Sequence, residues 1–422
     1  MGLLFWWCNL HWVTTVVKEK KFWRLNVNKK RNENQLLIIV IALFISIIGG
    51  CQKNTVITDD PVIEKPVYKP FSYDDINPEL KDTIYFALEY IEEDAILPRL
   101  VAVKNNGEIV TIVKNSPEFA QKNNTASYGN GMIYFFNGYS VHKISLREGN
   151  GNYNQEKLFD LNKSMWLNYL AVCGDYLFYS YDQKSGKSVH NDVDILYRNY
   201  IGRYNLITQE NDPVFLDIGF HEIVGLAGLG NDQLAYTESY GMKNTVKILN
   251  IATNEEKTIT KYGNIAFSFN DKLLYKEIGL YKTVAYYEYS ENNFHVIDDQ
   301  INTWMEGDPN ILPYKNGYLY VKGVSVYFHN GIKNTKLLTI SEKKYDYIDA
   351  LELISQNILK IYIFYHMDGH DGNTIIKYDL NTNKIKVLDL EDDNIADIYN
   401  NMYLPFYYVP IVYDENMTIT EN

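Results

Sequence analysis

The chain has 422 residues, of which 40 are Lys or Arg and 53 are Asp or Glu, so its formal net charge is −13; 37 residues are Tyr. Residues 51–422 alone carry 33 basic and 51 acidic side chains, a formal charge of −18. Such a surface argues against nucleic acid or anionic lipid headgroups as direct ligands. The length beyond residue 50 is enough for one closed domain and leaves no room for a second sizeable one.

Residues 1–50 have the features of a secretion leader. Lys29-Lys30-Arg31 precede an apolar run of 13 residues, 36–48, and Gly49-Gly50-Cys51 follows it. This run is too short to cross a bilayer core of ~30 Å as a helix, but it suits the core of a signal peptide. A short membrane anchor, or an uncleaved signal beside a chance Cys, is the alternative.

The order of basic region, apolar core, small pair and Cys resembles a bacterial lipoprotein signal peptide. The resemblance implies that Cys51 carries a diacylglycerol thioether, becomes the mature N-terminus and holds the protein at the outer face of the cytoplasmic membrane. Residues 1–26 are rich in aromatic side chains and lie ahead of the basic region, so we interpret them as a start assigned too far upstream. Residues 51–70 contain Pro61, Pro66 and Pro70 and are predicted to form a tether.

The first segment after the tether has a helical pattern. Leu80, Ile84, Leu88, Ile91 and Ala95 share one face at helical spacing, which predicts a helix over 79–97. A polar-turned hairpin follows over 100–113, and no inner strand is expected before it.

A repeated phrase then begins at Asn130. Six times, a turn of Asn, Asp or Gly is followed by an apolar and an aromatic position, and successive copies lie 39 to 57 residues apart. The central apolar residues of these copies are Ile133, Leu177, Leu234, Leu273, Leu319 and Leu359. Recurrence of several short strands with this period is typical of β-propeller blades.

A second hairpin in each unit supports the same architecture. Segments such as 249–260 and 375–390 alternate apolar and polar residues around Asn- and Asp-rich turns. Seven such hairpins occur, one more than the repeated phrases, so we expect seven blades, with six or eight as alternatives. Residues 394–413 are rich in Tyr and Phe and are predicted to supply the missing inner strands of the first blade, although Pro405 and Pro410 restrict their pairing.

The predicted fold is therefore all-β: a single propeller of four-stranded blades over residues 71–413, with a short tail at 414–422. Its hairpins, especially 378–390, resemble those of TolB-like propellers, a family common among exported bacterial proteins. The chain lacks the recurrent Trp-Asp and Gly-Gly signatures of the WD and kelch repeats.

Candidate binding residues follow from the blade order. In an antiparallel four-stranded blade, the turn between strands 2 and 3 and the connection from strand 4 to the next strand 1 open on the same face. Trp166 and Trp304 are the two Trp residues beyond the leader, and both are predicted in such connections. Each indole either stacks on a sugar or peptide from this face or wedges between blades. His221 and Glu222 lie in an equivalent connection, as a possible acid–base pair or a simple solvated pair.

A strand 2–3 turn gathers metal-ligating residue types. His366, Asp368, His370 and Asp371 could hold Ca²⁺ or Zn²⁺, but the spacing fails the calcium-loop pattern, and a plain Gly-rich turn is the alternative. The segment 182–194 is a similar candidate. No other cofactor is predicted. Cys173, on a predicted inner strand, is expected to be a buried structural thiol.

Common catalytic motifs do not occur in the sequence, and catalytic residues stay unknown. The leading hypothesis is a monomeric, lipid-anchored binding or scaffold module that engages a protein, peptide or glycan through its loop face. The alternative is a propeller hydrolase or lyase that acts on carbohydrate at the central funnel.

Overall fold

The computed structural model describes residues 76–409, except for residue 94 and the segments 114–125, 148–152, 188–194, 231, 242, 270, 279–282, 291–292, 303–310, 341–346, 368–369 and 389–402. The predicted leader, Cys51, the tether and the tail lie outside these residues. In the described part, no helix has the length and apolar character needed to cross a membrane.

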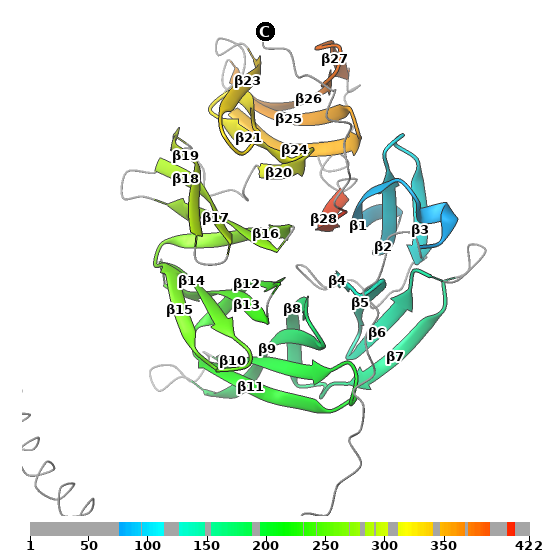
Figure 1. The fold of residues 1–422 in the computed structure, drawn as a ribbon, viewed down its shortest axis with the longest axis vertical. Coiled ribbons are helices and arrows are strands. Elements are labelled where there is room, and N and C mark those ends of the chain that lie inside the picture. The colour runs from blue at the N-terminus through cyan, green and yellow to red at the C-terminus, as the bar shows by residue number, and fades with distance from the viewer. Residues whose placement is uncertain are drawn as a thin grey trace, which may run out of the picture. The chain divides into compact units, whose positions relative to one another are not determined.

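Seven four-stranded antiparallel sheets form the blades of a β-propeller, and in each blade the strands run from the ring centre outward (Figure 1). Blade 1 contains β28 (Tyr403–Tyr408), β1 (Thr83–Glu93), β2 (Ala95–Lys104) and β3 (Ile109–Val113). Blade 2 contains β4 (Ala126–Gly129), β5 (Met132–Asn137), β6 (Ser140–Ser145) and β7 (Gln155–Asp160). Blade 3 contains β8 (Met165–Cys173), β9 (Tyr176–Lys187), β10 (Ile195–Asn205) and β11 (Asn211–Gly219).

Four further blades complete the ring. Blade 4 contains β12 (Glu222–Leu229), β13 (Gln233–Tyr240), β14 (Lys243–Asn250) and β15 (Glu256–Thr260). Blade 5 contains β16 (Gly263–Phe269), β17 (Lys272–Ile278), β18 (Thr283–Ser290) and β19 (Asn293–Asn302). Blade 6 contains β20 (Ile311–Tyr314), β21 (Gly317–Lys322), β22 (Ser325–His329) and β23 (Asn334–Thr339). Blade 7 contains β24 (Tyr347–Ser355), β25 (Ile358–Met367), β26 (His370–Asp379) and β27 (Ile385–Leu388). The prediction of seven blades is confirmed.

The repeated sequence phrase is the turn between strands 1 and 2. Asn130, Asp232 and Asp271 adopt positive φ angles of 55°, 55° and 59°, which Asn and Asp tolerate better than other side chains. A carbonyl in this turn accepts a hydrogen bond from the residue just after strand 3, as from Ile251 N to Asp232 O at 2.9 Å. The apolar residue that follows this turn in blades 2 to 7, and its counterpart after Asp82 in blade 1, is at most 3% exposed: Ile84, Ile133, Leu177, Leu234, Leu273, Leu319 and Leu359.

The copy at Ile84 was hidden by a helical pattern, and the predicted helix over 79–97 is wrong. A single 3₁₀ turn, η2 (Pro78–Leu80), precedes β1 there. Asp82 has the positive φ of 66°, and its carbonyl accepts from Asn105 N at 2.8 Å, which matches the bond seen in blades 2, 3, 4 and 7. Five consecutive β1 residues, Ile84 to Leu88, are buried because a blade packs on both faces. Continuous burial removes the alternation that would have distinguished this strand from a helix.

Blade 1 joins the two ends of the described chain. Strand β28 pairs antiparallel with β1, with Leu88 opposite Leu404 and Phe86 opposite Tyr407. Pro405 pairs with Ala87 next to a register shift, and β28 is an end strand of its sheet, a position at which Pro is tolerated. The prediction that the two ends of the chain meet in this blade is confirmed, but residues 394–413 supply only one of the missing inner strands, β28. The other, β1, precedes the hairpin at 100–113, where no inner strand was expected.

Adjacent blades pack tightly near the ring centre. A Cβ on Gly228 of β12 would lie 1.8 Å from the carbonyl oxygen of Val172 on β8. This distance is a steric clash, so only Gly fits at this position. Phe86 of blade 1 stacks on Tyr128 of blade 2 with ring centroids 5.6 Å apart. The core is thus a series of seams between blades.

The outer hairpins are held by Asn and Asp side chains, as the sequence predicted. Oδ1 of Asn250 accepts from the backbone N–H of Ala252 and of Thr253 at 3.0 Å each. Oδ1 of Asp379 accepts in the same way from Asn381 at 2.9 Å and Thr382 at 3.0 Å. Each side chain replaces a backbone acceptor in the strand 3–4 turn.

A pair of imidazoles bridges blades 5 and 6. Nε2 of His295 lies 3.0 Å from Nε2 of His329, and Nδ1 of His329 lies 2.7 Å from Oδ1 of Asn334. Asn334 donates through Nδ2 to the carbonyl of Ile297, so its Oδ1 accepts and His329 carries its proton on Nδ1. His329 is therefore neutral, and its Nε2 accepts a hydrogen bond from Nε2–H of His295. A second proton on His329 would place its Nε2–H directly against that of His295.

This geometry predicts a loss of stability in mild acid. Burial lowers the pKa of His329 below its ordinary value of about 6.5, and His295 lowers it further, against the opposing effects of Asn334, Glu288 and Asp298. The free energy of unfolding should be highest above pH 6.5 and should fall as the pH drops from about 6.5 toward the lowered pKa. Thermal unfolding at pH 7.5 and pH 5.0 measures this, and the drop should be smaller for His329→Gln. Equal drops would contradict the role of His329.

The β28 strand should control the stability of the ring. Deleting residues 403–422 removes β28, and we expect a loss of at least about 3 kcal/mol, since even one large buried side chain is worth that much. Deleting residues 414–422 alone is the control and should leave the unfolding midpoint unchanged. Chemical denaturation of both variants gives the comparison; a stable ring without β28 would contradict closure by this strand.

Candidate functional site

The two faces of the ring are distinguished by their turns. One face carries the strand 2–3 turns and the connections between blades, and the other carries the strand 1–2 and strand 3–4 turns. Among the described residues, seven aromatic side chains are exposed. Six of them lie at the first face, on blades 2 to 4 and on the connection into blade 5: Tyr139, Trp166, Tyr197, Phe220, Tyr240 and Tyr262. We call this side the aromatic face; the seventh side chain, Phe294, lies on the opposite face.

Trp166 is the predicted site residue that the structure places most clearly. It is the second residue of β8, the innermost strand of blade 3, and its side chain is 57% exposed. The indole therefore does not wedge between blades. Trp304, the other predicted Trp, lies outside the described residues.

A carboxylate and an amide lie beside Trp166. Asp182 of β9 is directly opposite Trp166 in the strand register, which puts both side chains on the same side of the sheet with Cβ atoms about 5 Å apart. Asn168 donates from Nδ2 to Oδ1 of Asp182 at 2.9 Å. Burial raises the pKa of Asp182 above its ordinary value, and the hydrogen bond from Asn168 acts in the opposite direction. Asp182 belongs to a strand, whereas the sequence placed it at the start of a loop whose residues 188–194 are outside the described part.

His221 lies on the connection from β11 to β12, as predicted, whereas Glu222 is the first residue of β12. His221 does not pair with its neighbour: its Nδ1 lies 3.3 Å from Oε1 of Glu238, and its ring centroid lies 4.7 Å from that of Tyr240. Glu238 also accepts from Nζ of Lys247 at 2.9 Å. The His ring therefore belongs to a charged cluster within the aromatic face.

The predicted metal ligands stand on a tight hairpin. His366 pairs with Asp371 across β25 and β26, and Met367 pairs with His370. The side chains of His366, His370 and Asp371, and the whole of Asp368, lie outside the described part, so the metal prediction stays a prediction. Within the ranges that the structure describes, no three His, Cys, Asp or Glu side chains form a group able to hold a metal ion.

Cys173 is buried at the end of β8, in agreement with its predicted structural role. Its Sγ lies 3.1 Å from the carbonyl oxygens of both Leu229 and Gln233. Burial raises the pKa of this thiol to about 12, so the reactive thiolate is suppressed.

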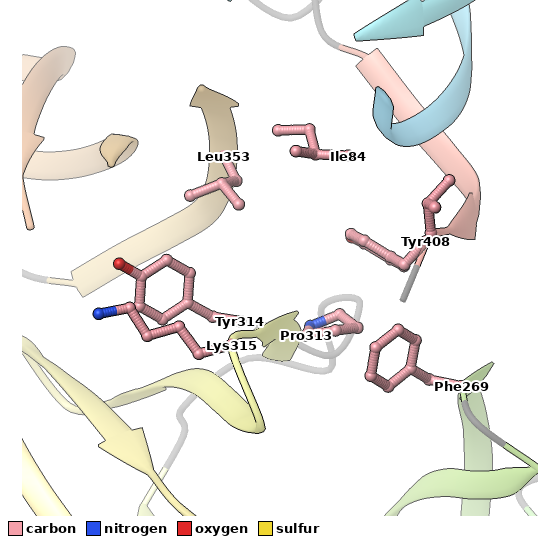
Figure 2. A pocket seen from close by; sticks show the side chains of 8 residues that line it. Ile84, Phe269, Pro313, Tyr314, Lys315, Leu353 and Tyr408 are labelled. Carbon is pink, nitrogen blue, oxygen red and sulfur yellow. The ribbon is translucent and has the colours of Figure 1, made fainter. Parts of the chain in front are cut away.

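A small pocket lies near the ring centre on the face opposite the aromatic one. Figure 2 shows Ile84, Tyr408, Phe269, Pro313, Tyr314, Lys315 and Leu353 converging from blades 1, 5, 6 and 7 around it, and Val409 adds to the lining. Its volume is about 10 Å³, room for about one water molecule, and it is open to solvent. Burial lowers the pKa of Lys315, whose amine lies 5.4 Å from the centre of the Tyr314 ring. None of its described lining residues is a carboxylate.

Comparisons with known proteins find likeness of fold only. No family model matches the chain, and no curated protein matches it. A puromycin hydrolase structure is 10% identical, with a TM-score of 0.46 over 74% of this chain and 53% of its own. A Mycobacterium tuberculosis puromycin-hydrolyzing peptidase is 10% identical, with a TM-score of 0.45 over 78% of this chain and 57% of its own.

The propeller domain of the Trilobed protease from Pyrococcus furiosus is also similar. It is 10% identical, with a TM-score of 0.34 over 62% of this chain and 81% of its own. The chain spans little more than half the length of the two puromycin-hydrolysing proteins. At these identities the likeness concerns the fold, and no activity follows from it.

Proposed function

We propose that the protein is a lipid-anchored, extracytoplasmic binding or scaffold module that engages its ligand through the aromatic face. The observation that carries this proposal is the gathering of six exposed aromatic side chains on one side of blades 2 to 5. Large aromatic side chains supply contact area at low cost in conformational entropy, and exposed groups of them mark interaction surfaces.

The negative charge of the propeller restricts the class of ligand that it can bind. A formal charge of −18 over residues 51–422 repels nucleic acid and acidic polymers, and the proposed partners are a protein, a peptide or a glycan. A single closed ring buries its own sheet edges and can act as a monomer.

The anchor rests on the leader sequence. The lipoprotein pattern ending at Cys51 supports export and attachment by a lipid at the outer face of the cytoplasmic membrane. Residues 52–70 would then hold the propeller at most ~60 Å from the bilayer if fully extended.

The alternative, a hydrolase or lyase at the central funnel, would need convergent acid and base groups there. The described lining of the central pocket offers one amine and two phenols beside apolar side chains. The exposed aromatic side chains lie on the other face of the ring from this pocket. We therefore prefer the binding role to the hydrolase or lyase alternative.

Substitutions on the aromatic face should weaken binding strongly while leaving the fold intact. Glycan and peptide arrays probed with the full-length chain should lose signal about tenfold or more for Trp166→Ala and Tyr240→Ala, because exposed aromatic anchors carry much of the binding energy. Ile332→Ala is the control, since Ile332 is 90% exposed on the opposite face. Unfolding midpoints should be unchanged in all three variants. Equal binding by the Trp166 and Ile332 variants would remove the aromatic face from the proposal.

The anchor predicts a covalent lipid at one position. Cells fed a radiolabelled fatty acid should label the wild-type protein and leave Cys51→Ser unlabelled. After cell fractionation, the wild type should be found in the membrane fraction. Cys51→Ser should be found in the soluble fraction or as unprocessed precursor. Cys173→Ser is the matched control and should stay labelled. Labelled Cys51→Ser protein would disprove lipidation at this residue.

A further inference from the structure

The seam between blades 3 and 4 carries polar groups beside Trp166. Tyr181 packs into the cluster that joins blades 2 and 3, so Asp182, the next residue of the strand, points to the other side, toward blade 4. Trp166, opposite Asp182 in the register, points the same way. The connection carrying Phe220 and His221 crosses from blade 3 to blade 4 on this same face.

Trp166, Asn168 and Asp182, the three side chains at this seam, differ in their exposure to solvent. Trp166 is exposed, whereas Asn168 and Asp182 are half-buried. The hydrogen bond from Asn168 to Asp182 orients both side chains before any ligand arrives. An ionised carboxylate has about four acceptor sites, and Asn168 uses one of them on Oδ1. The side-chain carbonyl of Asn168 adds another acceptor.

This set of groups matches a pyranose ring better than a peptide. The C–H face of a sugar is apolar and flat enough to stack on an indole, while hydroxyl groups around its rim donate to carboxylate and amide oxygens. Hydrogen bonds to an ionised acceptor are about twice as strong as neutral ones. An extended peptide would instead need a free strand edge or a pocket for its side chains.

Charge selects among the glycans. Asp182 itself, the exposed Glu222 on β12 and the −18 charge of residues 51–422 all disfavour a uronate or sulfated chain. A neutral sugar presents donors without a repelling anion.

We infer that the seam between blades 3 and 4 is a binding subsite for a neutral glycan, with Trp166 as the stacking platform and the Asp182–Asn168 pair as the hydroxyl acceptors. The inference rests on the proposed role of the aromatic face and names the ligand class of that face. Trp166 and Asp182 contact the sugar, and Asn168 both contacts it and positions Asp182.

The test is calorimetric titration of the full-length chain in detergent with neutral tetrasaccharides of glucose, mannose and N-acetylglucosamine, and with a galacturonate tetrasaccharide. At least one neutral probe should bind, and the galacturonate probe should not. Asp182→Ala should weaken that binding about tenfold or more, because a hydrogen bond to a charged group is lost, and Trp166→Ala should weaken it at least as much. Asp182→Asn keeps the shape and should show an intermediate loss.

Glu210→Ala is the matched control, since Glu210 lies in a strand 3–4 turn of the same blade on the opposite face. Its affinity should equal that of the wild type, and circular dichroism melts should show that every variant folds. Tighter binding of galacturonate, or neutral binding that survives both Trp166→Ala and Asp182→Ala, overturns the inference. If no neutral probe binds but an array peptide is lost on Trp166→Ala, the glycan inference fails while the binding function stands. If no array ligand depends on Trp166 or Tyr240, both fail.

Discussion

The turn between strands 1 and 2 is the constraint on which each blade depends. A residue with positive φ reverses the chain, as at Asn130 and Asp232, and a carbonyl of the turn accepts an N–H from beyond strand 3. Three strands are thus fixed by one short segment. The apolar residue that follows is driven into the seam with the neighbouring blade, where it is almost completely buried. Repeating this unit builds both the blades and their contacts.

Because the seams use the apolar residues of the strands, the turns and strand ends present most of the exposed aromatic side chains. The two faces differ in what their turns contain. Strand 3–4 turns are occupied by Asn and Asp side chains that satisfy their own backbone, as at Asn250 and Asp379. Strand 2–3 turns, the strand ends beside them and the interblade connections carry six of the seven exposed aromatic side chains of the described residues. Aromatic side chains therefore collect on the face whose turns do not need Asn or Asp side chains to satisfy their backbone.

The sequence was sufficient for the architecture because its period and turn residues report local geometry. It failed at β1, where burial on both sides of the strand gave Ile84 and Leu88 a spacing that a helix shares. Blade order placed Trp166 at the correct end of β8, but whether the indole faces solvent depends on the packing of neighbouring blades. Tyr240 and Phe220 were missed because one exposed aromatic residue cannot be told from the many buried ones by composition. Their position in strand 2–3 turns and connections was the available signal.

Blade 1 has a consequence for the order in which the chain can fold. Tyr85 pairs with Tyr408, so this sheet joins residues separated by more than 300 positions, whereas each of the other six blades is contiguous in sequence. During synthesis, which starts at the N-terminus, blades 2 to 7 can each assemble as their strands are completed. The inner edge of β1 stays unpaired until β28 has been made. Since loop closure over a long separation is slow, ring closure should be the final folding step. Until then, the unpaired inner edge of β1 remains the part of the molecule most exposed to wrong pairing.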